Sequence, residues 1–360
     1  MTHAVESADV AIVGGGIMGL ATAERLGAHG LSVIVVDESG IAGGASGASG
    51  GLVRALDMNG RQAAWAAEGL DRYLRRGWRG TWPQVHEQGS LTLVDADGFD
   101  RAVAAVAAVR AAGQRAGILP AEEIRATFAG LSVPDGFVGV FEPGAGWLPA
   151  KDVAAAMLSD AGPRVQVRRA RATRLLTSDA GVSGVETTTG RVRARAVLLT
   201  AGVGSVPLAE SLGVQLPLRT RAVSYCLFEP AAGTDVSGLP TVVDFATGAW
   251  LRRWNSGATL LAGVASKETD VPATVRAGVP PAEERRVRDV VRHRYPPLAG
   301  ARLVGGVSAY DAMAAGGEGA VTVWPQVPGL VTATGWNGGG FKLAPAVGDH
   351  AAARLREAIG

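Results

Sequence analysis

The first forty residues alternate between apolar runs and one amphipathic stretch. Residues 9–13 and 33–36 are apolar runs, and residues 20–28 repeat apolar positions at helical spacing. Short uninterrupted apolar runs are typical of parallel strands covered on both faces, and Gly30 follows the amphipathic stretch as glycine commonly follows a helix. The pattern predicts a strand, a helix and a second strand that ends at Asp37.

The rest of the chain predicts a β-rich middle between helical segments. Residues 38–60 are mostly small and predict a loop, and short strands with turns are expected throughout 164–200. The spacing predicts helices over 61–75, 99–112, 283–293 and 344–358, and strands over 90–94, 196–200, 222–228, 249–254, 259–264 and 330–334. An α/β opening, a β-rich middle and an α/β ending predict an α/β fold, α+β overall, with two interleaved domains.

Composition narrows the possible partners. The 360 residues carry a net charge of +2 without a basic block, so we expect no nucleic-acid partner. No apolar run reaches the roughly 18 residues of a membrane span and no charged-then-apolar leader is seen, so we expect no membrane partner and a cytoplasmic location. The single cysteine, Cys226, excludes an internal disulfide, and the five histidines are scattered, so we expect no metal.

A glycine-rich turn joins the first predicted strand to the first predicted helix. Gly14, Gly16 and Gly19 have the spacing of a dinucleotide-binding turn, in which glycines allow a tight turn, close approach to a pyrophosphate and packing of helix on strand. The N–H groups at the helix start then hold negative charge. Asp37 can accept hydrogen bonds from both hydroxyls of an adenosine ribose, which disfavours NADP.

The loop after the second strand distinguishes FAD from NAD. Residues 40–51 are almost all small, and a flavoprotein uses such a loop to pass beside the isoalloxazine ring. A nicotinamide dehydrogenase rarely has one there. We therefore expect FAD, with a plain NAD dehydrogenase as an alternative.

Three blocks of sequence resemble one family of flavoenzymes. They are residues 14–37, residues 43–54 (GGASGASGGLVR) and residues 335–345 (GWNGGGFKLAP). Together they resemble the FAD-dependent amine and amino-acid oxidases of the D-amino-acid-oxidase type, and within these the sarcosine oxidases (flavin subunit), dimethylglycine dehydrogenase and glycine oxidase. The resemblance implies a Rossmann-like FAD-binding domain (1–80, 146–213 and 316–360) interleaved with a β-rich substrate-binding domain (81–145 and 214–315).

The resemblance also implies which residues contact FAD. Weaker matches are Ala201-Gly202, after the strand predicted over 196–200, and residues 216–219 (LPLR). The expected cofactor-binding residues are Gly14, Gly15, Gly16, Ile17, Met18, Gly19, Asp37, Glu38, Gly44, Ala45, Ser46, Ala172, Ala201, Gly202, Gly338, Gly339, Gly340, Phe341 and Lys342.

Lys342 and Arg54 are the leading candidates for a substrate site. Only three of the 35 basic residues are lysines, and Lys342 stands among glycine, phenylalanine and apolar residues, where a solvated lysine is uncommon. The resemblance places Arg54 and Lys342 at the family's carboxylate-binding pair, and an arginine fork beside a lysine charge suits an α-carboxylate. A surface lysine in a loop is the alternative interpretation of Lys342.

Three further residues complete the expected catalytic set. Trp250 and Tyr310 resemble aromatic positions that wall the amine pocket, with core packing as the alternative for each. Arg252 follows Trp250 by two residues, so it either lines the pocket or points to solvent from a strand edge.

Two departures from the family pattern bear on the chemistry. Monomeric sarcosine oxidases attach their flavin through a cysteine, whereas Ser308 occupies the matching position and Cys226 lies far from it in sequence, so we expect non-covalent FAD. The lysine that speeds reaction with oxygen in those enzymes is replaced by Leu261, and Lys267 is six residues further on. The sequence therefore leaves oxidase and dehydrogenase both open.

The expected function is oxidation of the C–N bond of a small amino acid or N-alkyl amino acid. Hydride transfer to flavin N5 leaves an imine that water hydrolyses, and the electrons pass to O2, giving H2O2, or to another acceptor. The alternatives are a flavin dehydrogenase subunit that passes electrons to a partner, and a flavin monooxygenase. The oligomeric state is open.

Overall fold

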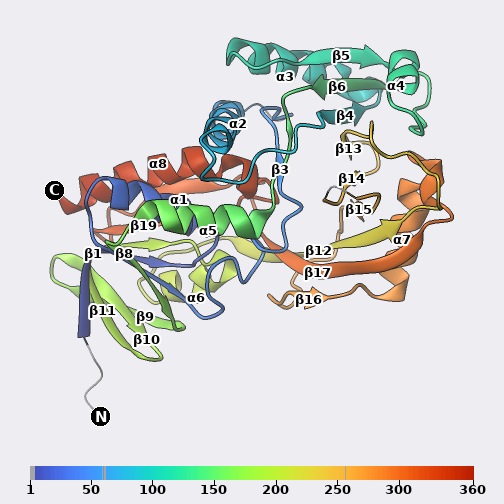
Figure 1. Ribbon diagram of the computed structural model, residues 1–360. Helices are drawn as coiled ribbons and strands as arrows, with labels where there is room; N and C mark the ends of the chain where they lie inside the picture. The colour runs from blue at the N-terminus through green and yellow to red at the C-terminus, as the bar shows by residue number, and fades with distance from the viewer. Residues whose placement is uncertain (1–4, 59, 61, 256) are drawn as a thin grey trace.

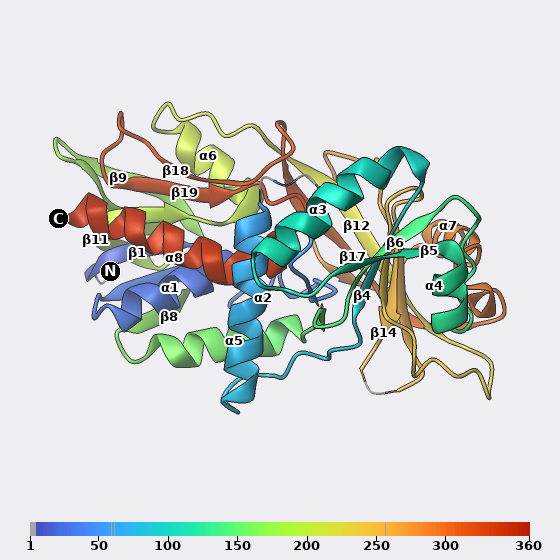
Figure 2. The same ribbon diagram turned by 90° about the horizontal axis from the view of Figure 1, so that it is seen from above.

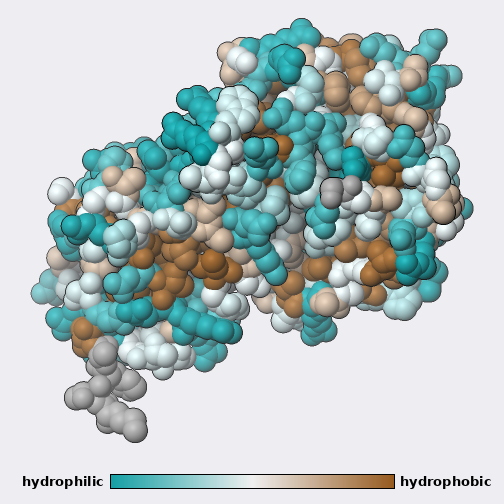
Figure 3. Space-filling model, in the orientation of Figure 1, coloured by the Kyte–Doolittle hydropathy of each residue, from teal (hydrophilic) through white to brown (hydrophobic). Residues whose placement is uncertain are grey.

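Two large β-sheets lie side by side in the computed structural model, which describes residues 5–58, 60, 62–255 and 257–360 (Figure 1). The outline of the molecule narrows between the half that holds the first sheet and the half that holds the second (Figure 3). None of the helices in the described ranges is both long and apolar enough to span a membrane.

The first sheet has eight strands among the described residues and contains both apolar runs from the start of the chain. Its main path is β18 (Ala320–Val323), β19 (Leu330–Thr334), β11 (Gly190–Leu199), β1 (Val5–Val13), β2 (Val33–Asp37) and β8 (Val165–Arg169); β10 (Gly181–Thr187) also pairs with β11, and β9 (Ala172–Ser178) pairs with β10. β1 runs parallel to both β11 and β2. Residues 10–13 of β1 and 33–36 of β2 are buried, as the uninterrupted apolar runs predicted.

Helices cover both faces of this sheet. α1 (Ile17–Ala28), α5 (Ala150–Ala161) and α8 (Gly340–Ile359) lie alongside one another on one face, and α2 (Ala63–Trp78) runs across them (Figure 2). The short α6 (Ser205–Glu210) packs on the other face. Val10 and Ile12 belong to the core under α1, whereas Ala11 and Val13 belong to the core under α6. Alternate residues of β1 therefore pack into two separate cores on the two faces of the sheet.

The second sheet has nine strands in the part of the chain that the structure describes. Their order is β16 (Arg276–Ala277), β17 (Arg302–Ala314), β12 (Leu218–Glu229), β15 (Leu260–Val264), β14 (Ala249–Arg253), β13 (Thr241–Asp244), β4 (Ser90–Val94), β6 (Val138–Glu142) and β5 (Gly117–Pro120). One face, with Leu91, Leu251 and Phe228, packs into a core that also contains residues of α4 (Ala121–Thr127) and α7 (Pro281–Val291). The opposite face carries the polar residues discussed below.

The remaining elements are short or peripheral. They are β3 (Leu52–Val53), which pairs with β7 (Gly146–Trp147), α3 (Phe99–Ala111), and the 3-10 turns Ala96–Gly98, Gly202–Gly204 and Pro296–Leu298.

The expected fold class is confirmed, and three element boundaries are corrected. The strands at 90–94 and 330–334 are found as predicted. The loop predicted over 38–60 contains the strand β3, whose two residues are too few to show a pattern of apolar and polar positions. The helix predicted over 61–75 is α2, which begins at Ala63 and ends at Trp78, and Arg61 lies outside the described residues. The domain boundaries stay a prediction.

The C-terminal helix begins at Gly340, four residues before the predicted start. Proline within a helix removes one hydrogen bond, so Pro345 made the preceding residues look like a loop. The carbonyl that Pro345 leaves without its helical donor is that of Phe341, and the Tyr73 hydroxyl of α2 donates to it at 2.8 Å. Because α2 replaces the lost hydrogen bond, α8 continues through the proline and Lys342 lies in its first turn.

Candidate functional site

The glycine-rich turn has the geometry of a close backbone approach. Gly14 has φ +114°, and a Cβ atom there would lie 2.6 Å from the backbone carbonyl carbon of Thr200. A Cβ on Gly19 would lie 2.0 Å from the Gly14 carbonyl oxygen. Gly16 caps α1 without a side-chain hydrogen bond, so N–H groups of the first turn remain for an external acceptor.

The small-residue loop docks directly on this turn. The Ser46 hydroxyl accepts a hydrogen bond from the Ile17 N–H at 2.9 Å, and a Cβ on Gly16 would lie 3.0 Å from the same oxygen. The Asp37 carboxylate accepts hydrogen bonds from the Gly15 N–H and the Ser39 N–H, both at 2.8 Å. These bonds hold Asp37 at the carboxyl end of β2, beside the turn.

The C-terminal glycine segment closes the same region from another side. A Cβ on Gly340 would lie 3.3 Å from the Met18 side chain of α1. Ala201 also borders the turn, because its backbone nitrogen would lie 2.7 Å from a Cβ on Gly14. Gly202 has φ +56° and Gly338 has φ +83°, the left-handed region that favours glycine.

The residues present therefore fit a dinucleotide such as FAD. Blocks far apart in sequence meet at the carboxyl ends of β1 and β2, where ligands of such sheets bind, and the glycines leave backbone exposed to a phosphate. Glu38 follows Asp37 on the surface, Ala172 begins β9, and Gly44, Ala45, Gly339 and Phe341 lie in the same segments. The contact of each of these residues with a cofactor stays a prediction.

Lys342 is buried beside a carboxylate at the start of α8. It is 9% exposed, and its Nζ donates to the Leu56 carbonyl at 2.8 Å and lies 3.5 Å from Asp57 Oδ2. Burial, with the nearby charge of Arg54, lowers the pKa of Lys342 to about 8. The interpretation of Lys342 as a surface lysine is wrong.

Arg54 and Glu142 complete this group, which we call the Lys342 cluster (Lys342, Arg54, Asp57 and Glu142). Arg54 Nη1 donates to the Thr92 hydroxyl of β4 at 2.6 Å. Burial lowers the pKa of the Arg54 guanidinium, and the charge of Glu142 opposes that shift. Two cations are thus gathered with two carboxyl groups.

Glu142 ties the cluster to the segment that carries Arg54. It is 1% exposed, and its Oε1 accepts hydrogen bonds from the N–H groups of Ala55 at 2.8 Å and Leu56 at 3.0 Å. Its Oε2 has no partner among the described residues, and burial raises the pKa of the carboxyl group despite Arg54. Glu142, Asp57 and Thr92 stand in no motif, so no sequence pattern predicted that they would lie at this site.

Trp250 and Arg252 lie on the polar face of the second sheet. Trp250 of β14 is opposite Gly263 of β15, which is opposite Tyr225 of β12. A Cβ on Gly263 would lie 2.3 Å from the Trp250 ring, so glycine makes room for that ring. Arg252, two residues along the strand, points to the same face and is 3% exposed, so the interpretation of Arg252 as a solvent-directed side chain is wrong.

Tyr310 lies elsewhere. In the register of β12 and β17, Val307 is opposite Tyr225, and Tyr310 is three positions further, so the pleat turns it to the other face. Its hydroxyl would lie 3.3 Å from a Cβ on Gly44, in the small-residue loop. Burial, followed by the charges of Asp37 and Glu38, raises the pKa of Tyr310. Tyr310 therefore neighbours the cofactor segments rather than Trp250.

The residues at which the chain departs from the family pattern differ in their surroundings. The Ser308 hydroxyl donates to the Gly278 carbonyl at 3.0 Å. Cys226 is fully buried in the core of the second sheet, where burial raises the pKa of its thiol to about 12. Leu261 is buried, whereas Lys267 is exposed on the segment after β15.

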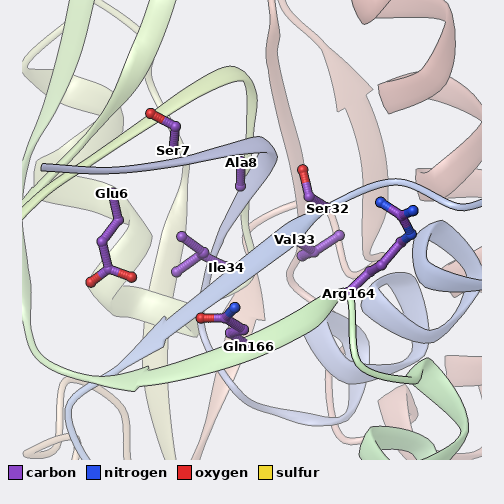
Figure 4. A pocket seen from close by; sticks show the side chains of 8 residues that line it. All are labelled: Glu6, Ser7, Ala8, Ser32, Val33, Ile34, Arg164 and Gln166. Atoms are coloured by element: carbon purple, nitrogen blue, oxygen red, sulfur yellow. The ribbon is translucent and has the colours of Figure 1, made fainter.

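A surface hollow of about 270 Å³ lies at the opposite edge of the first sheet (Figure 4). It is lined by Glu6, Ser7, Ala8, Ser32, Val33, Ile34, Arg164 and Gln166, from the amino ends of β1, β2 and β8. Glu6 is paired with Arg168, and Arg164 turns away from Glu6 in the view. The hollow is remote from the glycine turn, so it is not the candidate site. The described residues contain no cluster of three potential metal ligands.

Comparison with known proteins gives one family match and several similar structures. The profile of the family described as FAD dependent oxidoreductase (DAO) matches residues 9–354. Glycine oxidase from Pseudomonas putida is 32% identical over 240 residues, which cover 62% of this chain. The match spans only 63% of that enzyme's own length.

The structural matches extend over almost the whole chain. L-Proline dehydrogenase from P. horikoshii has a TM-score of 0.87 at 18% identity, with 98% of this chain and 94% of the other covered. Glycine oxidase from Geobacillus kaustophilus has a TM-score of 0.82 at 22% identity, with 99% and 95% covered. At these identities the likeness shows the fold alone.

Proposed function

Because this chain belongs to the DAO family of FAD dependent oxidoreductases, we propose that it oxidises the C–N bond of a small amino acid or N-alkyl amino acid. The products are an imine, which water hydrolyses to a carbonyl compound and an amine or ammonia, and two electrons for an acceptor. The similar glycine oxidase from Pseudomonas putida supports an amino-acid substrate.

The observation that carries the proposal is the position of the buried cations. Lys342 lies in the first turn of α8, directly after the glycine segment that borders α1. Arg54 directly follows β3, at the end of the small-residue loop, and reaches the polar face of the second sheet through Thr92. These two cations lie between the cofactor segments and that sheet beside two carboxyl groups, and the buried Arg252 on the same sheet face leaves a net positive charge that would attract a substrate carboxylate.

The chain's own residues prepare the amine for oxidation. When bound, FAD supplies the hydride acceptor. A substrate amine must be neutral to release hydride, and burial near Lys342 and Arg54 lowers the pKa of a substrate ammonium group. The half-buried Trp250 and the buried Tyr225 and Trp147 add apolar ring surface near the proposed site, which strengthens this effect.

We propose that FAD is held without a covalent bond. Ser308 has no thiol, and its hydroxyl is engaged with Gly278. The only thiol belongs to Cys226, which is buried in a core with a raised pKa and gives no thiolate at neutral pH. The proposed contacts are therefore the glycine turn, Asp37 and the two small-residue segments.

The acceptor of the electrons is O2, giving H2O2, or another oxidant. Leu261, at the position where the resemblance expects an oxygen-activating lysine, is 1% exposed and apolar. This observation favours the second candidate function, a dehydrogenase that passes electrons to a partner. The proposed setting is the cytoplasm, with an amino-acid substrate and this acceptor as the partners.

The test is an anaerobic screen of the purified, FAD-loaded protein with amino acids and N-alkyl amino acids. We expect at least one of them to bleach the absorbance of the oxidised flavin. Bleaching by none would overturn the proposal. Admitting air then separates oxidase from dehydrogenase, because only an oxidase regains its absorbance rapidly and releases H2O2.

A further inference from the structure

Arg252 is a buried cation without a carboxylate partner among the described residues. Its side chain is 3% exposed, and its one hydrogen bond there is from Nη1 to the Arg253 carbonyl at 2.6 Å. Its Nε, also buried, has no partner. By contrast Arg294, on the same half of the molecule, is paired with the buried Asp244 at 2.7 Å. A buried, incompletely bonded guanidinium is costly unless a ligand completes it.

Aromatic rings hold this guanidinium in place. Its carbon lies 4.0 Å from the centroid of the Trp147 ring and 5.0 Å from that of Trp254, and we call these three residues the Arg252 cage. His86 stacks on Trp147 with a centroid separation of 4.0 Å. The Trp147 Nε1 is a second buried donor for which the described residues offer no acceptor. Rings fix the orientation of a guanidinium but leave the N–H groups at its rim for another partner.

The same sheet face carries a row of incompletely bonded polar groups. Glu142 of β6 is opposite Ser90 of β4, which is opposite Thr241 of β13. Continuing the pairing of Val242 with Leu251 by one residue places Arg252 opposite Thr241. One buried polar atom of each of the four residues has no hydrogen-bond partner in the part of the chain that the structure describes: Glu142 Oε2, Ser90 Oγ, Thr241 Oγ1 and Arg252 Nε. Such a row is typical of a surface that binds a polar ligand with water.

The charges along this face differ from one end to the other. Arg54 and Lys342 lie with the carboxyl groups of Glu142 and Asp57, and each donates to a protein acceptor. Arg54 Nε, like Arg252 Nε, has no hydrogen-bond partner among the described residues, so what distinguishes Arg252 is that no carboxyl group of those residues lies near it. Three cations therefore face two carboxyl groups, and the uncompensated charge lies in the Arg252 cage. One singly charged anion would balance it.

We propose that Arg252, held in its cage by Trp147 and Trp254, binds the carboxylate of the substrate, a small amino acid with one carboxylate. In this arrangement the Lys342 cluster is a positioning group that is internally compensated, rather than the carboxylate clamp that the sequence resemblance implied. The proposal rests on the proposed function for the identity of the substrate. Its anion-binding claim stands on the geometry of Arg252 alone.

Calorimetric titration of the full-length, FAD-loaded protein with acetate, propanoate and benzoate tests the claim without turnover. We expect at least one of these monocarboxylates to bind the wild type. Arg252→Met should weaken that binding by about 10-fold or more, the scale of one charge-assisted hydrogen bond. Arg252→Lys should restore it only in part, because a lysine lacks the planar fork.

The matched control is Arg253→Met, which removes the same charge from the next residue on the opposite face of β14. It should leave anion binding unchanged. Arg252→Met should also unfold at the same temperature as wild type or higher, because removing a buried, uncompensated cation relieves its desolvation cost. This second measurement separates a ligand-binding residue from a structural one.

Three results would overturn the proposal. They are absence of binding by all three monocarboxylates, unchanged binding in Arg252→Met, or a loss in Lys342→Met that Arg252→Met does not match. None of them depends on the amino-acid screen. Failure of the screen alone would instead remove the proposed oxidation while leaving the anion site in place.

Discussion

The Lys342 cluster and the Arg252 cage both bury positive charge on one sheet face, but they do so by different means. In the cluster, Lys342 lies 3.5 Å from Asp57 and Arg54 is accompanied by Glu142. In the cage, Arg252 is enclosed by two indole rings and meets no carboxylate among the described residues. A buried cation with a nearby carboxyl group contributes to the stability of the fold. A buried cation without one keeps its desolvation cost, which an anionic ligand can offset.

The largest change in the free energy of unfolding is expected when a carboxyl group is removed from the Lys342 cluster. Glu142→Ala should lower the free energy of unfolding by about 3–5 kcal/mol, because it removes the carboxyl group with the larger effect on Arg54 and leaves two buried backbone N–H groups without an acceptor. Urea denaturation measures this. Glu142→Gln keeps an amide oxygen that can accept from those N–H groups, so it should lose less unfolding free energy than Glu142→Ala. Equal stability of the two variants would show that the backbone bonds do not matter.

A smaller loss of stability is expected when the hydrogen bond from Tyr73 to the Phe341 carbonyl of α8 is removed. Tyr73→Phe should cost about 1–3 kcal/mol of unfolding free energy, because the buried Phe341 carbonyl loses its donor at the turn that holds Lys342. Thermal and urea unfolding measure the loss. Tyr295→Phe is the control, since that buried tyrosine has no hydroxyl hydrogen bond among the described residues. A Tyr73→Phe variant as stable as this control would contradict the account.

The sequence predicted the cofactor half of the site better than the substrate half. The family expected from the three glycine blocks is confirmed, because residues such as Gly14 and Gly19 are required by backbone contacts that a Cβ would break. Glu142 and Trp147 escaped detection because each is a lone residue, brought to the site by pairing between strands far apart in sequence. Pro345 hid the start of α8, because the compensating Tyr73 hydroxyl comes from another helix.

The third expected difference is a pH dependence that only the cluster should show. The pKa of Lys342 is about 8 in the folded protein and 10.5 as the ordinary value. Between these pH values the unfolded chain holds more protons at this side chain, so its contribution to the free energy of unfolding rises with pH. Lys342→Met should flatten that rise in urea titrations between pH 8 and 10.5. Lys267→Met controls for loss of an exposed lysine, and an unchanged slope in Lys342→Met would contradict the prediction.

The most direct test of the difference between the two sites is the unfolding free energy of Arg54→Met beside that of Arg252→Met, measured by urea denaturation without added ligand. We expect Arg54→Met to lose about 3–5 kcal/mol, because it removes the cation with the larger effect on the buried Glu142 carboxyl group. Arg252→Met should lose nothing or gain stability. A loss in Arg252→Met as large as that in Arg54→Met would contradict this expectation, because Arg252 would then be as structural as Arg54.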